Sequence, residues 1–119
     1  MIQSFKEGQE FLAKGRNKLE RKVTNNTLVV ARENDVSVRL HNTDVVIFHE
    51  DGTITLDSGM WQTVTTKARM NEALGRLGTV MQSDWEWFYL PRGWQDKAEW
   101  IPFSDGMTVD GETGKVISA

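Results

Sequence analysis

Residues 27–58 narrow the choice of fold most, because apolar and polar residues alternate there in short runs. The runs are separated by short polar segments and cover residues 28–32, 36–41, 44–50 and 53–57. Such alternation is typical of a β-strand with one buried face, and Asp51-Gly52 between two runs is a strong hairpin signal. The pattern therefore predicts an antiparallel β-meander.

The turns of this meander predict a register. Two-residue turns at Asn42-Thr43 and Asp51-Gly52 would place Ile47 between Val38 and Leu56. One face is then apolar and is expected to form the core: Val36, Val38, Leu40, Val45, Ile47, Ile54 and Leu56. The other face is mixed: Ser37, Arg39, His41, Asp44, Val46, Phe48, Thr53, Thr55 and Asp57.

Two further segments have helical patterns. Residues 3–20 have an apolar stripe of Ile2, Phe5, Leu12 and Leu19. Gly8 and Gly15 weaken this helix, so either the helix packs closely at its glycines or Gly15 ends it. Residues 65–77 predict a second helix with Thr65 or Thr66 as its N-cap and a buried stripe of Met70, Ala73, Leu74 and Leu77. We expect this helix to pack on the core face of the meander.

The region 80–117 is rich in aromatic residues, because four of the five tryptophans lie within residues 85–100. Residues 80–90 predict one strand with Trp85, Trp87 and Tyr89 on one side, followed by an antiparallel return at 99–104 and a short final strand at 115–117. With 119 residues, the chain is long enough for one core. The predicted fold is a single α+β domain: an antiparallel meander with one or two helices packed on one face.

Several classes are excluded or disfavoured. Cysteine is absent, which excludes disulfides, thiolate metal sites and cysteine nucleophiles. No apolar run approaches about 20 residues, so we expect no membrane span, and the opening residues lack the apolar stretch of a secretory signal. Residues 1–22 carry a net charge of +3 although the whole chain carries −3. This basic segment is either a solvated helix face or a contact for a partner.

His41, Asp44, His49 and Glu50 have the side chains that bind zinc or manganese. In the predicted register, His41 faces Asp44 on the mixed face, whereas His49 lies on the core face at the far end. At most two ligands converge, so we predict no metal site, and we expect a His41–Asp44 pair that stabilises the turn. The same pair would suit a small hydrolase, but no nucleophile motif accompanies it, so no catalytic residue and no cofactor are assigned.

The segment 63–69 is a candidate anion site. Threonine hydroxyls and cations gather at a predicted helix start, where free N–H groups and the helix dipole attract phosphate or carboxylate. The candidate residues are Arg39, Thr65, Thr66, Lys67 and Arg69. The alternative is an ordinary threonine cap with two solvated cations.

The aromatic residues Trp85, Trp87, Tyr89 and Trp94 are candidates for an interface. Core packing and base stacking are the other interpretations. The nearby acidic residues Asp84, Glu86 and Asp96 disfavour a polyanion. We expect a homodimer, since a chain of this size has difficulty burying five indoles.

Three motifs resemble a family of short proteins from tailed bacteriophages. These are VRLHNTDVV at 38–46, followed by Asp51-Gly52 and by LDSGMWQTVTTKARMN at 56–71. The ending, WEWFY at 85–89 with PFSDGMT at 102–108, is also similar, so that the resemblance covers roughly residues 10–110. It implies a phage-encoded protein that acts in the cytoplasm of an infected bacterium.

Together these observations favour a non-catalytic accessory protein that binds a host or phage macromolecule, for example a component of host defence. The alternative is a nucleotide or nucleic-acid binder that uses the anion site, although a pI near 5.4 disfavours general DNA binding. A small enzyme that uses His41 and Asp44 is the third class.

Overall fold

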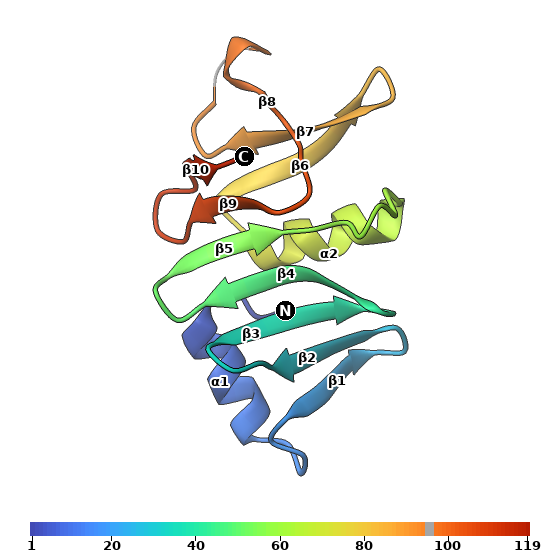
Figure 1. The fold of residues 1–119 in the computed structure, drawn as a ribbon, viewed down its shortest axis with the longest axis vertical. Coiled ribbons are helices and arrows are strands. Elements are labelled where there is room, and N and C mark those ends of the chain that lie inside the picture. The colour runs from blue at the N-terminus through green and yellow to red at the C-terminus, as the bar shows by residue number, and fades with distance from the viewer. Residues whose placement is uncertain (95–96) are drawn as a thin grey trace.

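The main element of the computed structural model, which describes residues 1–94 and 97–119, is a seven-stranded antiparallel sheet (Figure 1). Its strand order is β1-β2-β3-β4-β5-β9-β10. The bounds are β1 (Glu20–Thr24), β2 (Thr27–Ala31), β3 (Asp35–Leu40), β4 (Thr43–His49), β5 (Thr53–Leu56), β9 (Met107–Asp110) and β10 (Val116–Ser118). Strands β2 to β5 are the predicted meander.

A smaller sheet and the helices complete the fold. The sheet has the order β6-β7-β8, with β6 (Gly78–Ser83), β7 (Glu86–Pro91) and β8 (Ile101–Pro102). The helices are α1 (Phe5–Ala13), α2 (Val64–Leu74) and the short 3-10 helix η1 (Lys97–Glu99). Figure 1 shows α1 and α2 behind the large sheet, which confirms the α+β prediction with helices on one face.

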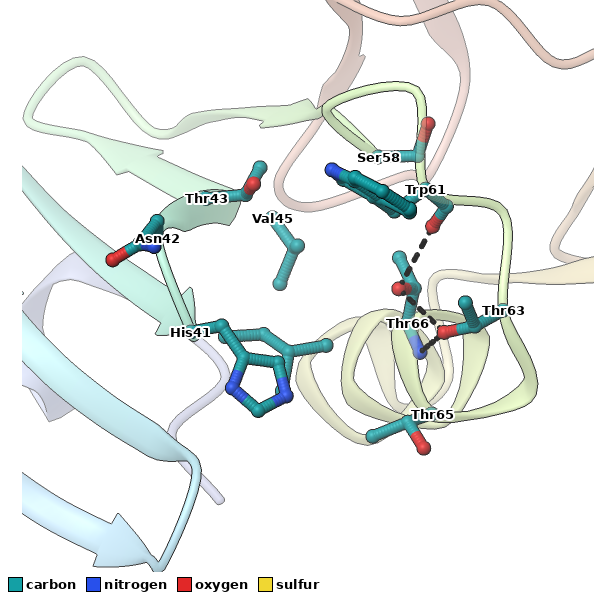
Figure 2. A pocket seen from close by; sticks show the side chains of 10 residues that line it. His41, Asn42, Thr43, Val45, Ser58, Trp61, Thr63, Thr65 and Thr66 are labelled. Carbon is teal, nitrogen blue, oxygen red and sulfur yellow. Dashed lines mark hydrogen bonds between the residues drawn. The ribbon is translucent and has the colours of Figure 1, made fainter.

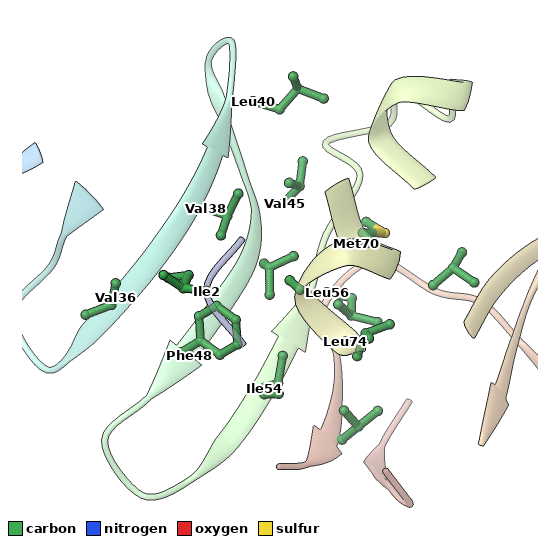
Figure 3. Close-up of a cluster of buried hydrophobic side chains, with 14 of the residues drawn as sticks. Ile2, Val36, Val38, Leu40, Val45, Phe48, Ile54, Leu56, Met70 and Leu74 are labelled. Atoms are coloured by element: carbon green, nitrogen blue, oxygen red, sulfur yellow. The ribbon is translucent and has the colours of Figure 1, made fainter. Parts of the chain in front are cut away.

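The core lies between the large sheet and the helices (Figure 3). Helix α1 contributes Leu12, and α2 contributes Met70, Ala73 and Leu74 of the predicted stripe. Leu77, the fourth residue predicted, lies beyond the end of α2 and is only half-buried. The sheet contributes Val29, Val36, Val38, Leu40, Val45, Val46, Phe48, Ile54, Leu56, Met107 and Val109. Trp87 and Tyr89 of the small sheet join the same cluster, so both sheets share one core.

The predicted register is wrong. Val38 pairs with Val46, whereas Ile47 pairs with Ser37 and Thr55. Val38 therefore faces the helices and Ile47, half-buried, lies on the outer face. Val46 and Phe48, which were expected on the mixed face, are buried in the core.

Two turns explain the error. The β3–β4 turn is His41-Asn42 rather than Asn42-Thr43, and His41 adopts a positive φ of 54°. A register shift then leaves Val45 without an opposite residue, so that Val45 and Val46 are both buried, as at a β-bulge. The β4–β5 loop has three residues and ends at Gly52 with a φ of 93°, a common form of hairpin loop.

The N-terminal helix is shorter than predicted. Ser4 caps it by accepting a hydrogen bond from the Glu7 N–H (3.1 Å), and it ends at Ala13 just before Gly15. Residues 20–24 form strand β1 instead, and Leu19 is 70% exposed rather than part of a buried stripe. The alternative in which Gly15 ends the helix is the observed one, and within the helix Gly8 packs so closely against Val36 that a β-carbon there would overlap its side chain.

The predicted strand 80–90 is also wrong, because it is a hairpin. Asp84 and Trp85 both have positive φ (51° and 70°) and form the turn between β6 and β7. The antiparallel return is confirmed, since β8 pairs with β7. Within the described residues, no helix is long and apolar enough to span a membrane.

Candidate functional site

A cavity of about 470 Å³ lies between the β3–β4 turn and the start of α2 (Figure 2). Two stretches of the chain form its walls: residues 40–45 around the β3–β4 turn, and residues 58–66, which run from the loop after β5 into the first turn of α2. The lining residues are Leu40, His41, Asn42, Thr43, Val45, Ser58, Trp61, Thr63, Thr65 and Thr66. The buried side chains of Leu40 and Val45 form its apolar part. The other lining residues contribute the Trp61 indole, several hydroxyl groups, the Asn42 amide and the His41 imidazole.

The loop after β5 and the first residue of α2 hold large apolar side chains in solvent. Met60, Trp61 and Val64 are 89%, 71% and 79% exposed, and we call them the α2 crest. In Figure 2 the Trp61 indole and the His41 imidazole lie on opposite sides of Val45. Trp61 was not among the predicted site residues, although a tryptophan that follows Ser58-Gly59 and precedes a helix could have indicated an exposed site.

Asp105 fixes this loop from a distant part of the chain. Its carboxylate accepts hydrogen bonds from the Ser58 N–H and the Ser58 hydroxyl (both 2.7 Å) and from the Met60 N–H (3.3 Å). Gly59 has a positive φ of 61° and lies against Thr43, where a β-carbon would overlap. Met60 also has a positive φ, 69°, which is unusual for a side chain of this size.

The N-cap of α2 is Thr63 rather than Thr65 or Thr66. The Thr63 hydroxyl accepts from the Thr66 N–H (3.1 Å), and the two hydroxyls lie 2.9 Å apart. The Thr66 hydroxyl donates to the Trp61 carbonyl (3.0 Å), which ties the crest to the helix. Thr66 is therefore buried and has a structural role, whereas Thr65 is exposed.

The structure does not bring the predicted cations to the cavity. Lys67 Nζ lies 5.7 Å from the centroid of the Trp87 ring. Arg69 Nε donates to the Thr27 hydroxyl (2.8 Å), and its Nη1 pairs with Glu72. Arg39 Nε donates to the His41 carbonyl (3.2 Å). Of the five candidates, Thr65 and Thr66 line the cavity and the three cations do not.

The predicted aromatic surface is divided. Trp85 is 91% exposed at the tip of the β6–β7 hairpin, whereas Trp87 and Tyr89 are buried in the core. Trp94 is partly exposed and makes an edge-to-face contact with Trp100, with 5.9 Å between centroids. The Tyr89 hydroxyl donates to the Gly114 carbonyl (2.6 Å), and burial raises the pKa of Tyr89 to about 12.

The predicted His41–Asp44 pair is wrong, because Asp44 accepts two hydrogen bonds from Arg32 instead (3.0 and 2.9 Å). The bond to Asp44 raises the pKa of Arg32 above its ordinary value. The displaced turn explains the change, since Arg39 rather than His41 is opposite Asp44.

The same change of register puts His49 on the outer face, not the core face. Its Nδ1 lies 2.7 Å from an Asp35 oxygen and its Nε2 lies 2.7 Å from the Thr55 hydroxyl, which in turn lies 3.0 Å from the Thr108 hydroxyl. The predicted register placed His49 and Thr55 on opposite faces of the sheet, so this network was not foreseen from the sequence. No group of three His, Asp or Glu residues within the described chain could hold a metal ion.

The comparisons with known proteins found one family. A family model described as Kyanoviridae Gp96 protein matches residues 5–110. No curated protein and no solved structure matches the chain.

Proposed function

The chain belongs to the Kyanoviridae Gp96 family of tailed cyanophages, and on this premise we propose that it is a non-catalytic accessory protein that binds a host or phage protein in the infected cell. The observation that carries the proposal is the α2 crest. Exposed apolar side chains rimmed by polar residues mark interaction sites, and tryptophan and methionine are enriched in protein interfaces.

The backbone of the crest supports this proposal. Met60 has a left-handed conformation that costs on the order of 1–3 kcal/mol in a non-glycine residue. The hydrogen bonds from Ser58 and Met60 to Asp105 hold the loop in that conformation. The fold thus stabilises a loop whose large apolar side chains contribute little to the core, as expected for a surface that contacts another molecule.

The Asp35–His49–Thr55 hydrogen bonds resemble a proton relay, but their setting favours a structural role. Catalysis of acyl transfer needs N–H donors directed at the developing oxyanion. Thr55 lies in β5, which pairs with β4 on one side and with β9 on the other. The backbone amides around Thr55 therefore take part in the sheet, and we propose binding rather than catalysis.

Binding of a nucleotide or nucleic acid through residues 65–69 is the second candidate. Thr65 and Thr66 line the cavity at the start of α2, which favours it. The contacts of Lys67 with Trp87 and of Arg69 with Thr27 weigh against it, since a phosphate would have to displace them. Binding that weakens steeply with added salt would support this candidate over the first.

The experiment for the first candidate is affinity capture from infected host cells with three forms of the tagged chain. Trp61→Ala should abolish capture of a partner that the wild-type chain retains. Leu19→Ala is the matched control, because Leu19 is equally exposed (70% against 71%) on a different part of the molecule. The partner is then purified and titrated against all three forms, and equal affinities would refute the proposal.

A further inference from the structure

The cavity beside Trp61 contains polar groups that the protein itself does not use. Among the described residues, no hydrogen bond involves the His41 imidazole, the Asn42 amide or the Thr65 hydroxyl, and all three line the cavity. By contrast, the hydroxyls of Ser58 and Thr66 are bonded to Asp105 and Trp61. The rim therefore offers free donors and acceptors that carry no formal charge when the imidazole is neutral.

The size and the walls of the cavity suit a flat organic group. Its volume of about 470 Å³ is within the range of small-molecule sites. The exposed Trp61 indole provides a stacking face, and the buried side chains of Leu40 and Val45 provide apolar contact. Figure 2 shows the Trp61 indole and the His41 imidazole on different walls of the cavity.

The charges around the cavity indicate what kind of group fits. None of the lining residues is an aspartate, glutamate, lysine or arginine. Of the candidate cations, Arg39 donates to the His41 carbonyl and Arg69 to Thr27, while Lys67 Nζ lies 5.7 Å from the centroid of the Trp87 ring. A phosphate would have no cationic anchor there, so the recognised group is uncharged.

We propose that this cavity binds a nucleobase, which stacks on Trp61 and is hydrogen-bonded at its edge by His41, Asn42 and Thr65. A base is planar and uncharged and carries donors and acceptors along its edges, which matches the free rim groups. An aromatic side chain of a partner protein would also stack, but it would leave most of these groups unpaired, which lowers affinity. The inference goes beyond the protein-binding function proposed above and shares only Trp61 with it.

One backbone feature supports a cavity that is built in advance. Met60, next to the lining residue Trp61, has a positive φ of 69°. Conformations of this kind in residues other than glycine cluster at ligand-binding sites. The other positive-φ residues of this kind in the described chain, His41, Asp84 and Trp85, lie in hairpin turns, which explain their conformation.

The test is titration of adenosine, guanosine, cytidine and uridine into the purified chain, followed by NMR of the indole N–H and imidazole signals. We expect at least one nucleoside to bind with a Kd below about 5 mM and to shift the Trp61 and His41 signals. Trp61→Ala should weaken binding by roughly 5- to 150-fold, the loss typical of one stacked base, and Trp61→Phe should restore most of it. Leu19→Ala is the matched control, since Leu19 is 70% exposed but does not line the cavity.

Three results would overturn the inference. The first is that no nucleoside binds at about 5 mM. The second is that Leu19→Ala weakens binding as much as Trp61→Ala does. The third is that AMP binds more than about tenfold tighter than adenosine, because a phosphate anchor would then dominate. None of these results bears on capture of a protein partner, so the two proposals fail separately.

Discussion

Replacing Asp105 by alanine tests how the α2 crest is held. The substitution removes the acceptor of three hydrogen bonds, two of them from Ser58 at 2.7 Å, and Ser58 is buried. A buried donor left without a partner costs about 1–3 kcal/mol. The two Ser58 donors therefore predict a loss of about 2–6 kcal/mol in the free energy of unfolding, with the longer Met60 bond adding little.

Urea denaturation followed by fluorescence measures this loss, and hydrogen exchange of the Ser58 and Met60 amides locates it. Asp105→Asn keeps one acceptor oxygen and should recover more than half of the lost stability. Glu33→Ala is the control, because Glu33 is exposed and makes no hydrogen bond with another described residue, so it should change stability by less than about 0.5 kcal/mol. If Asp105→Ala also changes stability by less than about 0.5 kcal/mol, the hydrogen bonds do not hold the loop as argued.

Three further predictions concern the core, the pH dependence and the assembly. Leu56→Ala should cost about 2–5 kcal/mol in urea denaturation and Ile47→Ala clearly less, because only Leu56 is fully buried; equal costs would contradict the observed register. The folded-state pKa of Tyr89, about 12, lies above its ordinary value of 10.0. The contribution of Tyr89 to the free energy of unfolding is therefore complete below about pH 10 and is lost as the pH rises toward 12. Tyr89→Phe should remove this loss of stability at alkaline pH, as measured by thermal melts at several pH values. Sedimentation at high micromolar concentration should show a dimer that Trp85→Ala weakens, and a monomeric wild-type chain would refute self-association.

Alternation predicted the strands of the meander well but could not determine their register. Val45 and Val46 are both apolar, and Ile47 and Phe48 are too, so a shift by one residue leaves an apolar set facing the core in either case. The decisive features are a positive φ at His41 and the three-residue loop that ends at Gly52, and the sequence specifies neither. The Asp84-Trp85 turn was missed for the same reason, since it contains no glycine or asparagine.

The candidate site was predictable only in part. The threonines at the start of α2 could be located from the sequence, because a hydroxyl before a helical pattern favours a cap. The directions of Lys67 and Arg69 depend instead on Trp87 and on Thr27, which is 42 residues away from Arg69. Contacts at such separations have no local sequence signal, so the separation of the cations from the cavity could not be foreseen.

The hydrogen bonds between Ser58 and Asp105 have a consequence for how the chain folds during synthesis. The two residues are 47 positions apart, and β9, which follows Asp105, pairs with β5, which precedes Ser58. A nascent chain that has emerged only through α2 has Trp61 but not the carboxylate that fixes its loop. Domains generally fold as units after their residues have emerged, so the crest and the cavity take their final form only when β9 has joined the sheet. A ribosome-bound fragment that ends before residue 105 therefore contains every residue that lines the cavity, but it lacks the carboxylate and the strand that hold those residues in place.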